Sequence, residues 1–230
     1  MLKIGVIGSK GKMGARICAL VEKAQDLQLT ARIDQHDSLT QLQPGNKPQV
    51  LIDFSTIEAT LQHAPIAAQM GIALVVGTTG LNEQQTSVLQ TASRNIPLVF
   101  APNMSVGVNV LFKLLAVAAK SLGPQFKVSM EETHHVHKKD APSGTAKKAL
   151  EVIAQYSPHQ AKDIPVQAHR VGEVIGDHSI TFASKLETLT LSHHAVSRDL
   201  FADGALTAAR WVATKPAGLY SMQDVLGLNA

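Results

Sequence analysis

Cysteine, aromatic residues and long apolar runs are all scarce in this sequence of 230 residues. The one cysteine, Cys18, has no partner for an internal disulfide, which fits a reducing compartment, so we expect a cytoplasmic protein. The most apolar stretch, residues 106–119, is interrupted by Asn109 and Lys113, and no segment reaches the ~18–20 apolar residues of a membrane span. Residues 1–8 are too soon broken by glycine for a signal peptide. We therefore expect no membrane partner.

A strong charge of one sign is also lacking. The chain has 21 Lys and Arg against 18 Asp and Glu, a net charge of +3 with His neutral. Only 4% of the residues are aromatic and no basic stripe is present, so we expect no nucleic acid partner. The 45% hydrophobic content is that of a globular protein. At this length folding buries roughly 70% of the chain's surface, so stability requires neither disulfides nor a metal.

Apolar strand segments alternate with helical segments over the first hundred residues. Strands are expected at 2–7, 27–33, 50–54, 73–76 and 97–100, and helices at 15–24, 57–70 and 83–93. This alternation is typical of a parallel sheet with helices as right-handed crossovers. It predicts a Rossmann-like α/β sheet domain.

The pattern changes after residue 100. A long apolar helix at 106–122 is followed by strands at 127–132, 166–170, 178–183 and 187–192, with one helix at 145–155 among them. Strands grouped in this way indicate an α+β unit with an open mixed or antiparallel sheet. The tail returns to helix at 204–212 and 221–226.

A glycine-rich loop joins the first expected strand to the first helix. Residues 8–14 read Gly-Ser-Lys-Gly-Lys-Met-Gly, in which Ser9 takes the place of the first glycine of the common dinucleotide-binding spacing. Glycines let the backbone approach a pyrophosphate, and the helix start supplies free N–H groups and a positive dipole end. Asp34, twenty residues beyond Gly14, ends the second strand, where an acid can bind a ribose hydroxyl. A glycine turn without a ligand is the alternative; strand, helix and acid together favour a nucleotide.

Two further loops follow strands of the same expected sheet. One reads Gly-Thr-Thr-Gly at 77–80 and the other Ala-Pro-Asn-Met at 101–104. Ligands of open parallel sheets bind beyond the carboxyl ends of the strands, so both loops could line a nicotinamide. In isolation each of them is an ordinary turn.

The most unusual stretch is residues 131–146, which has three His and two Lys within positions 134–139. The Pro-Ser-Gly-Thr at 142–145 leads into a helix that Ser143 or Thr145 can cap. A helix start beside cations suits a carboxylate, and His and Lys can both donate protons near neutral pH. The stretch therefore predicts a site for an acidic substrate.

Two other interpretations of this stretch compete. His134 and His137 could bind zinc, but no third ligand is evident and the neighbouring lysines oppose a divalent cation, so we expect no metal. A solvated charged loop is the second interpretation. His193 and His194 near the end of a strand are a similar case, for which we favour a structural role.

Together these motifs resemble those of the 4-hydroxy-tetrahydrodipicolinate reductases, long called dihydrodipicolinate reductases, of the diaminopimelate route to lysine. The resemblance spans nearly the whole chain and is most specific at 134–145; its weaker parts lie at 8–14, 51–54, 77–80, 103–109, 170–178 and 201–204. It implies a dinucleotide-binding domain made of residues 1–104 and 199–230, with a substrate-binding and tetramerisation domain at 105–198 inserted between them. It also implies a homotetramer that uses NADH or NADPH.

The resemblance places the family's roles on matching positions. His134 is similar to the catalytic acid/base and Lys138 to the proton donor. The substrate-binding positions are His135, Ser143, Gly144 and Thr145, and the cofactor-binding positions are Gly8, Ser9, Lys10, Gly11, Lys12, Met13, Asp34, Gly77, Thr78, Thr79, Ala101, Pro102, Asn103 and Met104. The implied substrate is a small cyclic imine with two carboxylates. Hydride adds to its ring, Lys138 stabilises the electron density that moves toward nitrogen and delivers a proton, and His134 assists the remaining proton transfer.

The sequence departs from the family's pattern after the second strand. It is short there, mainly between Asp34 and residue 50, and Gln35 stands where many relatives have Arg. Because Arg at that position would favour the 2′-phosphate of NADPH, we expect a preference for NADH. Lys10, Lys12 and His36 could still attract that phosphate.

Two alternative functions remain open at this point. Another two-domain NAD(P)-dependent oxidoreductase would not need the string at 134–145. A non-catalytic nucleotide-sensing module would tolerate loss of the proton donor. Both would keep the glycine loop, so the string is what separates them from the reductase.

Overall fold

The computed structural model describes residues 1–35, 37–42 and 44–229 and divides into two compact units. Unit 1 comprises Met1–Val106 and Asp199–Ala230, and unit 2 comprises Gly107–Arg198. Over the described ranges, no helix is long and apolar enough to cross a membrane. His36, which the sequence suggested as a phosphate contact, lies outside the described residues.

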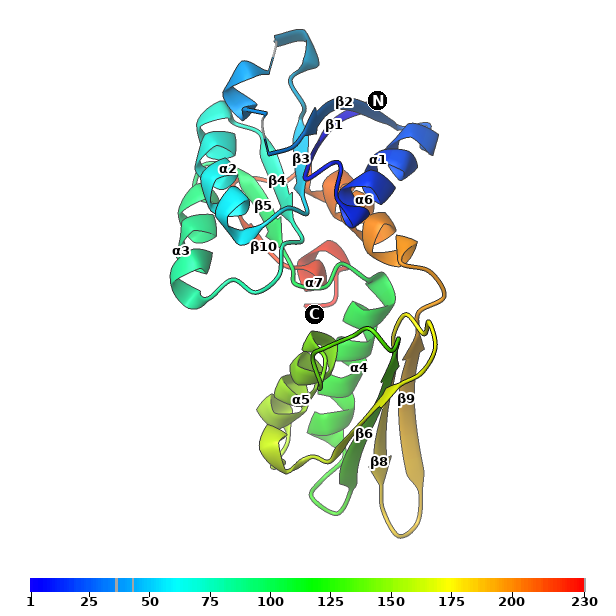
Figure 1. The fold of residues 1–230 in the computed structure, drawn as a ribbon. Helices are drawn as coiled ribbons and strands as arrows, with labels where there is room; N and C mark the ends of the chain where they lie inside the picture. Colours follow the sequence, from blue (N-terminus) through cyan, green and yellow to red (C-terminus); the bar gives the residue numbers. More distant parts are fainter. Residues whose placement is uncertain (36, 43, 230) are drawn as a thin grey trace. The chain divides into compact units, whose positions relative to one another are not determined.

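Unit 1 is built on a six-stranded parallel sheet with the order β10-β5-β4-β3-β1-β2 (Figure 1). Its strands are β1 (Leu2–Ile7), β2 (Leu27–Ile33), β3 (Val50–Asp53), β4 (Ala73–Val76), β5 (Pro97–Phe100) and β10 (Gly218–Tyr220). Every residue of β3 and β4 is buried, as is typical of parallel strands covered on both faces. The predicted Rossmann-like fold class is confirmed.

Helices cover both faces of this sheet. They are α1 (Lys12–Lys23), α2 (Ile57–Met70), α3 (Glu83–Ala92), α6 (Asp199–Val212) and α7 (Met222–Val225), with short 3₁₀ turns at Leu39–Gln41 and Pro44–Asn46. Figure 1 shows α1 and α6 on one face and α2 and α3 on the other. Successive side chains of each strand point to opposite faces of the sheet and belong to two separate cores. Val6 and Val75 pack with α1 and α6, whereas Ile7 and Leu74 pack with α2 and α3.

Three elements of unit 1 differ from the sequence-based expectation. Helix α1 begins at Lys12 rather than at residue 15, so Gly14 lies in its first turn. Helix α6 begins at Asp199 rather than at residue 204, so Gly204 lies inside the helix. There a Cβ would lie 1.8 Å from the carbonyl oxygen of Met104, and the glycine permits close packing. Strand β10 was not predicted, since three residues that include Gly218 carry no clear pattern and form a strand only by pairing with β5.

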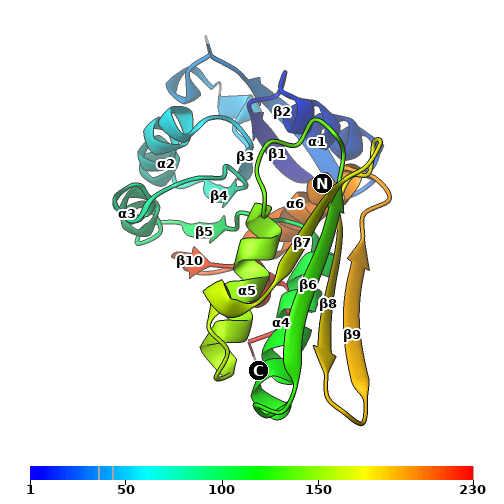
Figure 2. The same ribbon diagram turned by 60° about the horizontal axis from the view of Figure 1, so that its bottom comes forward.

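Unit 2 consists of a four-stranded sheet of order β7-β6-β8-β9 with two helices against one face (Figure 2). The elements are α4 (Val106–Ser121), β6 (Lys127–His134), α5 (Gly144–Tyr156), a 3₁₀ turn at Ala161–Asp163, β7 (Val166–Arg170), β8 (Asp177–Ala183) and β9 (Thr188–His194). The β6–β7 pair is parallel and the other pairs are antiparallel, so the sheet is mixed. Its inner face packs on α4 and α5 through Met130, Ile180 and Phe182.

Candidate functional site

In the glycine loop of unit 1, two glycines occupy positions where a side chain would clash with backbone atoms. Gly8 has φ +76°, and a Cβ there would lie 2.8 Å from the carbonyl oxygen of Phe54. A Cβ on Gly14 would lie 2.0 Å from the carbonyl oxygen of Gly8. The loop is therefore folded tightly against the first turn of α1, which brings that helix start close to the carboxyl end of β1.

The start of α1 is electrostatically suited to an anion. Gly11 is the N-cap residue and supplies no side-chain cap, and the first turn contains no acidic residue. Lys10 and Lys12 flank this turn and are exposed. A helix start whose N–H groups have no side-chain cap carries a partial positive charge that attracts phosphate groups.

Asp34, directly after β2, is hydrogen-bonded to the same loop. Its Oδ2 accepts a hydrogen bond of 2.6 Å from the hydroxyl of Ser9, and its Oδ1 accepts one of 3.1 Å from the amide of Lys10. The structure thus brings together the loop and the acid that the sequence places twenty residues beyond Gly14. Gln35 follows this acid and is exposed.

The loops after β4 and β5 show only part of their side chains to solvent. A Cβ on Gly77 would lie 2.2 Å from the ring of Phe54, and the buried hydroxyl of Thr78 accepts a hydrogen bond of 2.8 Å from Thr60. Thr79 is exposed. Because the Thr78 side chain is buried, its backbone is the part suited to a ligand.

The loop at 101–104 likewise contains both buried and exposed side chains. Ala101 and Met104 are buried, Pro102 is exposed, and Asn103 accepts a hydrogen bond of 2.9 Å from the amide of Ser105 through its side-chain oxygen. Met104 belongs to the core that α1 and α6 share. Its side chain therefore has a packing role in this structure.

In unit 2 strand β6 carries polar groups on the face that packs on the helices. Its burial alternates, so that Val128, Met130, Glu132 and His134 share the inner face. The strand runs two residues beyond the predicted end, and His134 is therefore fixed on a strand rather than on a loop. Strand register sets Glu132 opposite His178 on β8 and His134 opposite Arg170 on β7.

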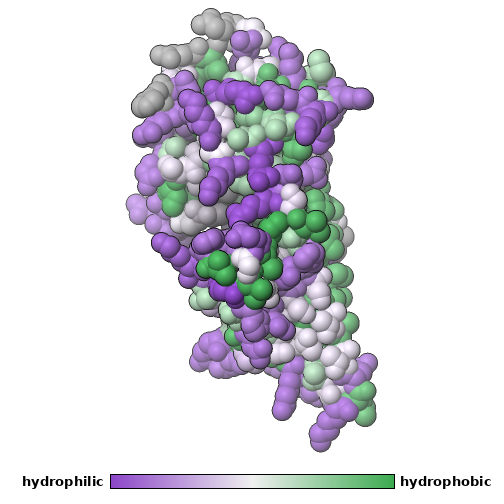
Figure 3. Space-filling view, turned by 45° about the vertical axis from the view of Figure 1, so that its right-hand side comes forward, coloured by the Kyte–Doolittle hydropathy of each residue, from purple (hydrophilic) through white to green (hydrophobic). Residues whose placement is uncertain are grey.

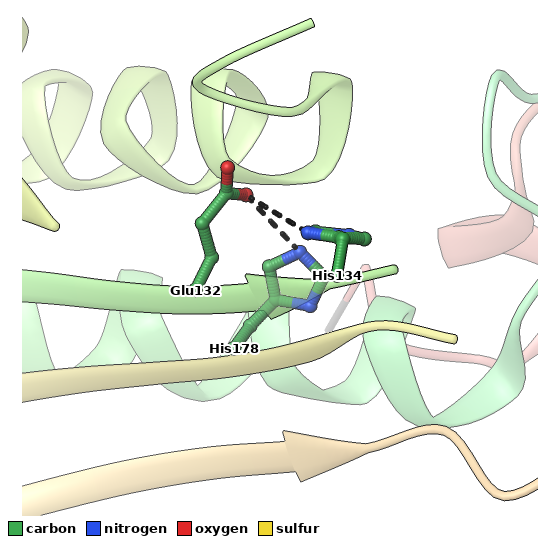
Figure 4. Close-up of side chains that lie close together, drawn as sticks. All are labelled: Glu132, His134 and His178. Carbon is green, nitrogen blue, oxygen red and sulfur yellow. Dashed lines mark ion pairs between the residues drawn. The ribbon is translucent and has the colours of Figure 1, made fainter. Parts of the chain in front are cut away.

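One carboxylate oxygen of Glu132 faces both His134 and His178, whose rings lie next to each other (Figure 4). Its Oε2 is 3.8 Å from Nδ1 of His134 and 3.7 Å from Nε2 of His178, and the two rings meet edge to face with centroids 5.1 Å apart. The same carboxylate accepts hydrogen bonds of 3.0 and 3.2 Å from the amide of Ser143. Its other oxygen lies 3.8 Å from the guanidinium of Arg170.

The spacing of these three side chains alone would suit a metal ion. The cluster does not include His137, the second zinc ligand that the sequence suggested. The carboxylate is, however, already engaged by the Ser143 amide and faces the positive Arg170. These contacts oppose a further cation, so we describe the cluster as a hydrogen-bonding and ion-pairing network.

Both buried histidines are poor bases in this environment. Burial lowers the pKa of His178 to about 3, and positive charge on His134, His193 and Lys138 adds to the effect. Burial also lowers the pKa of His134, while the Glu132 carboxylate acts in the opposite direction. Both rings are therefore neutral near pH 7.

Lys138 lies on the loop that follows β6. Its ammonium donates to both carboxylate oxygens of Asp140 at 2.8 and 2.9 Å, and this bond lowers the pKa of Asp140. His135 is half-buried, with its ring 6.2 Å from that of His137. The structure thus keeps the Lys138 ammonium hydrogen-bonded to a carboxylate.

The start of α5 is held by its cap. Ser143 is buried, and its hydroxyl accepts a hydrogen bond of 3.1 Å from the amide of Ala146 and lies 3.3 Å from Nε2 of His178. Since its amide is bound to Glu132, Ser143 is engaged inside the protein. Gly144 is exposed, Thr145 is half-buried, and the first turn has no acidic residue. Gly144 and Thr145 therefore present the helix start on which a carboxylate can bind.

Sequence reasoning assigned no role to Glu132, Arg170 or His178. A signal for Glu132 was present, because a strand in which Val128 and Met130 face the core places residue 132 on the same face. A carboxylate at a strand position that faces the apolar core indicates a buried charge that is compensated by polar or charged partners. His178 had the same signal, because Ile180 and Phe182 face the core and place residue 178 on the same face of its strand. Arg170 had no such signal, since it reaches Glu132 only through pairing of strands distant in the sequence.

Comparison with known proteins covers both units. Residues 2–104 match the family described as "Dihydrodipicolinate reductase, N-terminus" and residues 107–226 match "Dihydrodipicolinate reductase, C-terminus". The 4-hydroxy-tetrahydrodipicolinate reductase of Nitrosomonas eutropha is 42% identical over an alignment of 266 positions, gaps included, which covers 100% of this chain and 99% of the relative. A protein of the same name from Methanoculleus marisnigri is 40% identical, with 99% of this chain and 100% of the relative covered.

A solved structure shows the same fold. The dipicolinate-bound dihydrodipicolinate reductase from Paenisporosarcina sp. TG-14 has a TM-score of 0.87 at 24% identity, covering 97% of this chain and 98% of that chain. The two sequence matches together span nearly all of the chain and include both the glycine loop and the 134–145 segment. On these grounds the chain belongs to the dihydrodipicolinate reductase family.

Proposed function

We propose that this protein is a nicotinamide-dependent reductase that converts 4-hydroxy-tetrahydrodipicolinate to tetrahydrodipicolinate in the diaminopimelate route to lysine. The observation that carries this proposal is the family match over both units at about 40% identity to relatives of that name. His134 at the end of β6, Lys138 on the loop that follows and the start of α5 supply the acid–base groups and the carboxylate site that such a reaction requires.

Unit 1 would hold the dinucleotide. The turn that Gly8 and Gly14 keep free of side chains fits a pyrophosphate against the uncapped start of α1, and Asp34 lies beside that turn to bind a ribose. The remaining predicted contacts are the loops at 77–79 and 101–104. When bound, the nicotinamide supplies the hydride, and this chain's residues bind and orient it.

Unit 2 would bind the cyclic dicarboxylate. One substrate carboxylate is bound at the start of α5 by Gly144 and Thr145, with Ser143 holding that turn from inside and His135 completing the site. Lys138 donates the proton that balances electron density arriving at the ring nitrogen, and Asp140 keeps its ammonium in place. The neutral His134 accepts or returns the remaining proton.

We infer a preference for NADH from the residue after Asp34. Gln35 is neutral and offers no charge to a 2′-phosphate. We also place the protein in the cytoplasm, in keeping with its free, buried Cys18.

We further propose a homotetramer assembled through the outer face of the unit 2 sheet. This face carries small polar side chains in opposed pairs, with Thr181 across from Thr190 and Ser179 across from Ser192. Figure 3 shows strongly hydrophilic side chains over much of the surface but a pale region over these strands. A flat surface of short side chains allows close approach of a second sheet.

A coupled assay tests the proposed function. The purified protein is mixed with the synthase that makes the unstable substrate, and loss of reduced nicotinamide is followed at 340 nm with NADH and with NADPH in turn. We expect turnover that depends on the synthase, with the higher kcat/KM for NADH. No synthase-dependent oxidation with either cofactor would contradict the reductase, and an equal or higher kcat/KM for NADPH would contradict the cofactor preference alone.

A further inference from the structure

The Glu132 carboxylate takes no part in the reaction proposed above, although it lies at the centre of the site. Its side chain is 0% exposed. It stands on the inner face of β6, in line with the core residues Val128 and Met130. A buried charge destabilises a fold unless its partners compensate, so the partners of Glu132 indicate what it does.

The shortest contacts of this carboxylate are to the start of α5. Both of its oxygens accept from the amide of Ser143, at 3.0 and 3.2 Å. This amide belongs to the N-cap residue, whose hydroxyl in turn caps the helix at Ala146. Hydrogen bonds to an ionised acceptor are about twice as strong as those between neutral groups. The carboxylate therefore fixes the position and orientation of the first turn of α5 relative to β6.

The guanidinium of Arg170 extends this arrangement to the loop before α5. It lies 3.8 Å from the carboxylate of Glu132. Its Nε donates to the carbonyl oxygen of Lys138 at 3.1 Å, and its Nη2 donates to the carbonyl oxygen of Asp140. The backbone that carries the proton donor and the backbone that opens α5 are thus both tied to one buried ion pair.

His178, on β8, contacts both Glu132 and the N-cap residue Ser143. Its Nε2 lies 3.7 Å from Glu132 and 3.3 Å from the hydroxyl of Ser143. His134 lies 3.8 Å from the same carboxylate oxygen and carries its ring at the end of the strand. The carboxylate of Glu132 thus holds the helix start by hydrogen bonds and lies beside the His134 ring on the same strand (Figure 4).

We propose that Glu132 is a positioning residue, whose carboxylate holds the start of α5 at a fixed distance from His134 so that a planar ring dicarboxylate is bound between them. This inference rests on the proposed function, because it takes the start of α5 as the substrate-carboxylate site. It adds a specific role to a residue that touches no substrate. Preorganisation of this kind raises affinity because the loop is ordered before the ligand arrives.

The test compares Glu132→Gln with Glu151→Gln. The second variant is a matched control, because Glu151 is a carboxylate of the same unit, on α5, and its side chain is 63% exposed. In Glu132→Gln one side-chain oxygen can still accept from the Ser143 amide, but the charge that binds Arg170 is lost. Dipicolinate, a planar pyridine dicarboxylate, is titrated into each full-length protein by calorimetry, and NADH is titrated separately.

We expect the Kd of dipicolinate to rise roughly three- to tenfold in Glu132→Gln and more than tenfold in Glu132→Ala, on the scale of one charged hydrogen bond. The Kd of NADH should stay within about twofold in all variants, since the nucleotide site is in unit 1. In turnover the substrate KM should rise more than kcat falls. A merely structural role would lower the active fraction, and thereby kcat, without changing either Kd.

Two outcomes would overturn the inference: a Glu132→Gln protein that binds dipicolinate as tightly as the wild type, or one whose affinities for dipicolinate and NADH fall in the same proportion. If Glu132→Ala does not fold, Glu132→Gln decides the question. The titration needs no turnover. A wild type that binds dipicolinate but does not oxidise NADH in the coupled assay would therefore defeat the proposed function while leaving Glu132 testable.

Discussion

At the scale of single residues, the chemistry of unit 2 depends on which charges are buried and which are neutralised. Lys138 donates hydrogen bonds to the Asp140 carboxylate, whereas the burial of His134 and His178 lowers the pKa of each ring and keeps it neutral. The site therefore contains a proton donor and a proton acceptor of different chemical type, which is the arrangement that a proton-coupled hydride addition needs.

Replacing Lys138 with Ala should reduce turnover far more than it reduces cofactor binding. The ammonium acts on charge that develops only in the transition state, so we expect kcat to fall about 100-fold or more and the KM of NADH to change less than about twofold. Steady-state kinetics in the coupled assay measures both. Lys139→Ala, at the exposed neighbouring residue, is the control and should retain most activity. An unchanged kcat in Lys138→Ala would remove this residue from the mechanism.

His178 should make the protein's stability sensitive to mild acid. Its pKa is about 3 when folded and near the ordinary 6.5 when unfolded, so the unfolded chain binds more protons between these values. The contribution of neutral His178 is complete above pH 6.5 and is lost progressively as pH falls toward 3. At pH 5 this loss is about 2 kcal/mol.

Urea unfolding at pH 7.5 and at pH 5 measures this effect. We expect the free energy of unfolding to fall less between the two pH values in His178→Gln than in the wild type, whatever the variant's stability at pH 7.5. His137→Gln serves as the control because its side chain is 78% exposed. Equal pH dependence of the wild type and His178→Gln would show that His178 is not neutral in the fold.

At the scale of elements, the glycine loop and the first turn of α1 act as one rigid unit. The contact between Gly14 and the carbonyl of Gly8 leaves no room for a methyl group, and the hydrogen bonds from Ser9 and Lys10 tie the loop to Asp34. The proposed nucleotide site is thus formed by a backbone that a ligand can approach closely, rather than by long side chains.

Gly14→Ala should therefore damage both stability and nucleotide binding. The added Cβ must push α1 away from the loop, and we expect a destabilisation of about 1–3 kcal/mol together with a weaker affinity for NADH. Thermal unfolding and an NADH titration measure the two effects. Gly45→Ala is a matched control, because a Cβ at Gly45 meets nothing within 4 Å. Wild-type stability and affinity in Gly14→Ala would mean that the loop is looser than described.

At the scale of the whole molecule, the outer face of the unit 2 sheet is the surface on which the proposed tetramer depends. We expect light scattering to give the wild type a mass of four 24.5 kDa chains. Thr190→Arg should produce smaller species, because a long charged side chain prevents close approach of two sheets. Thr91→Arg, on α3 of unit 1, should leave the mass unchanged. A wild type that is monomeric at micromolar concentrations would refute the assembly.

Much of the fold followed from local patterns. Apolar runs separated by helical periodicity predicted the parallel sheet, and their bounds agree closely because each buried strand is a short run of β-branched and aliphatic residues, as in β3 and β4. The glycine loop and the 134–145 segment were likewise recognisable, since close backbone approach and proton transfer each need particular residue types at fixed spacing. These features depend on neighbours in sequence, so the sequence by itself determined them.

Only the tertiary structure decided how distant segments meet. The register of β6 against β7 and β8 gathers Arg170 and His178 around Glu132, and pairing with β5 alone makes a strand of Gly218–Tyr220. In unit 1, Arg210 of α6 binds Asp26 at 2.7 and 2.9 Å although 184 residues separate them. Such contacts arise from the packing of whole elements, where one residue's slip in register would send each side chain to the opposite face, and no local pattern specifies that choice.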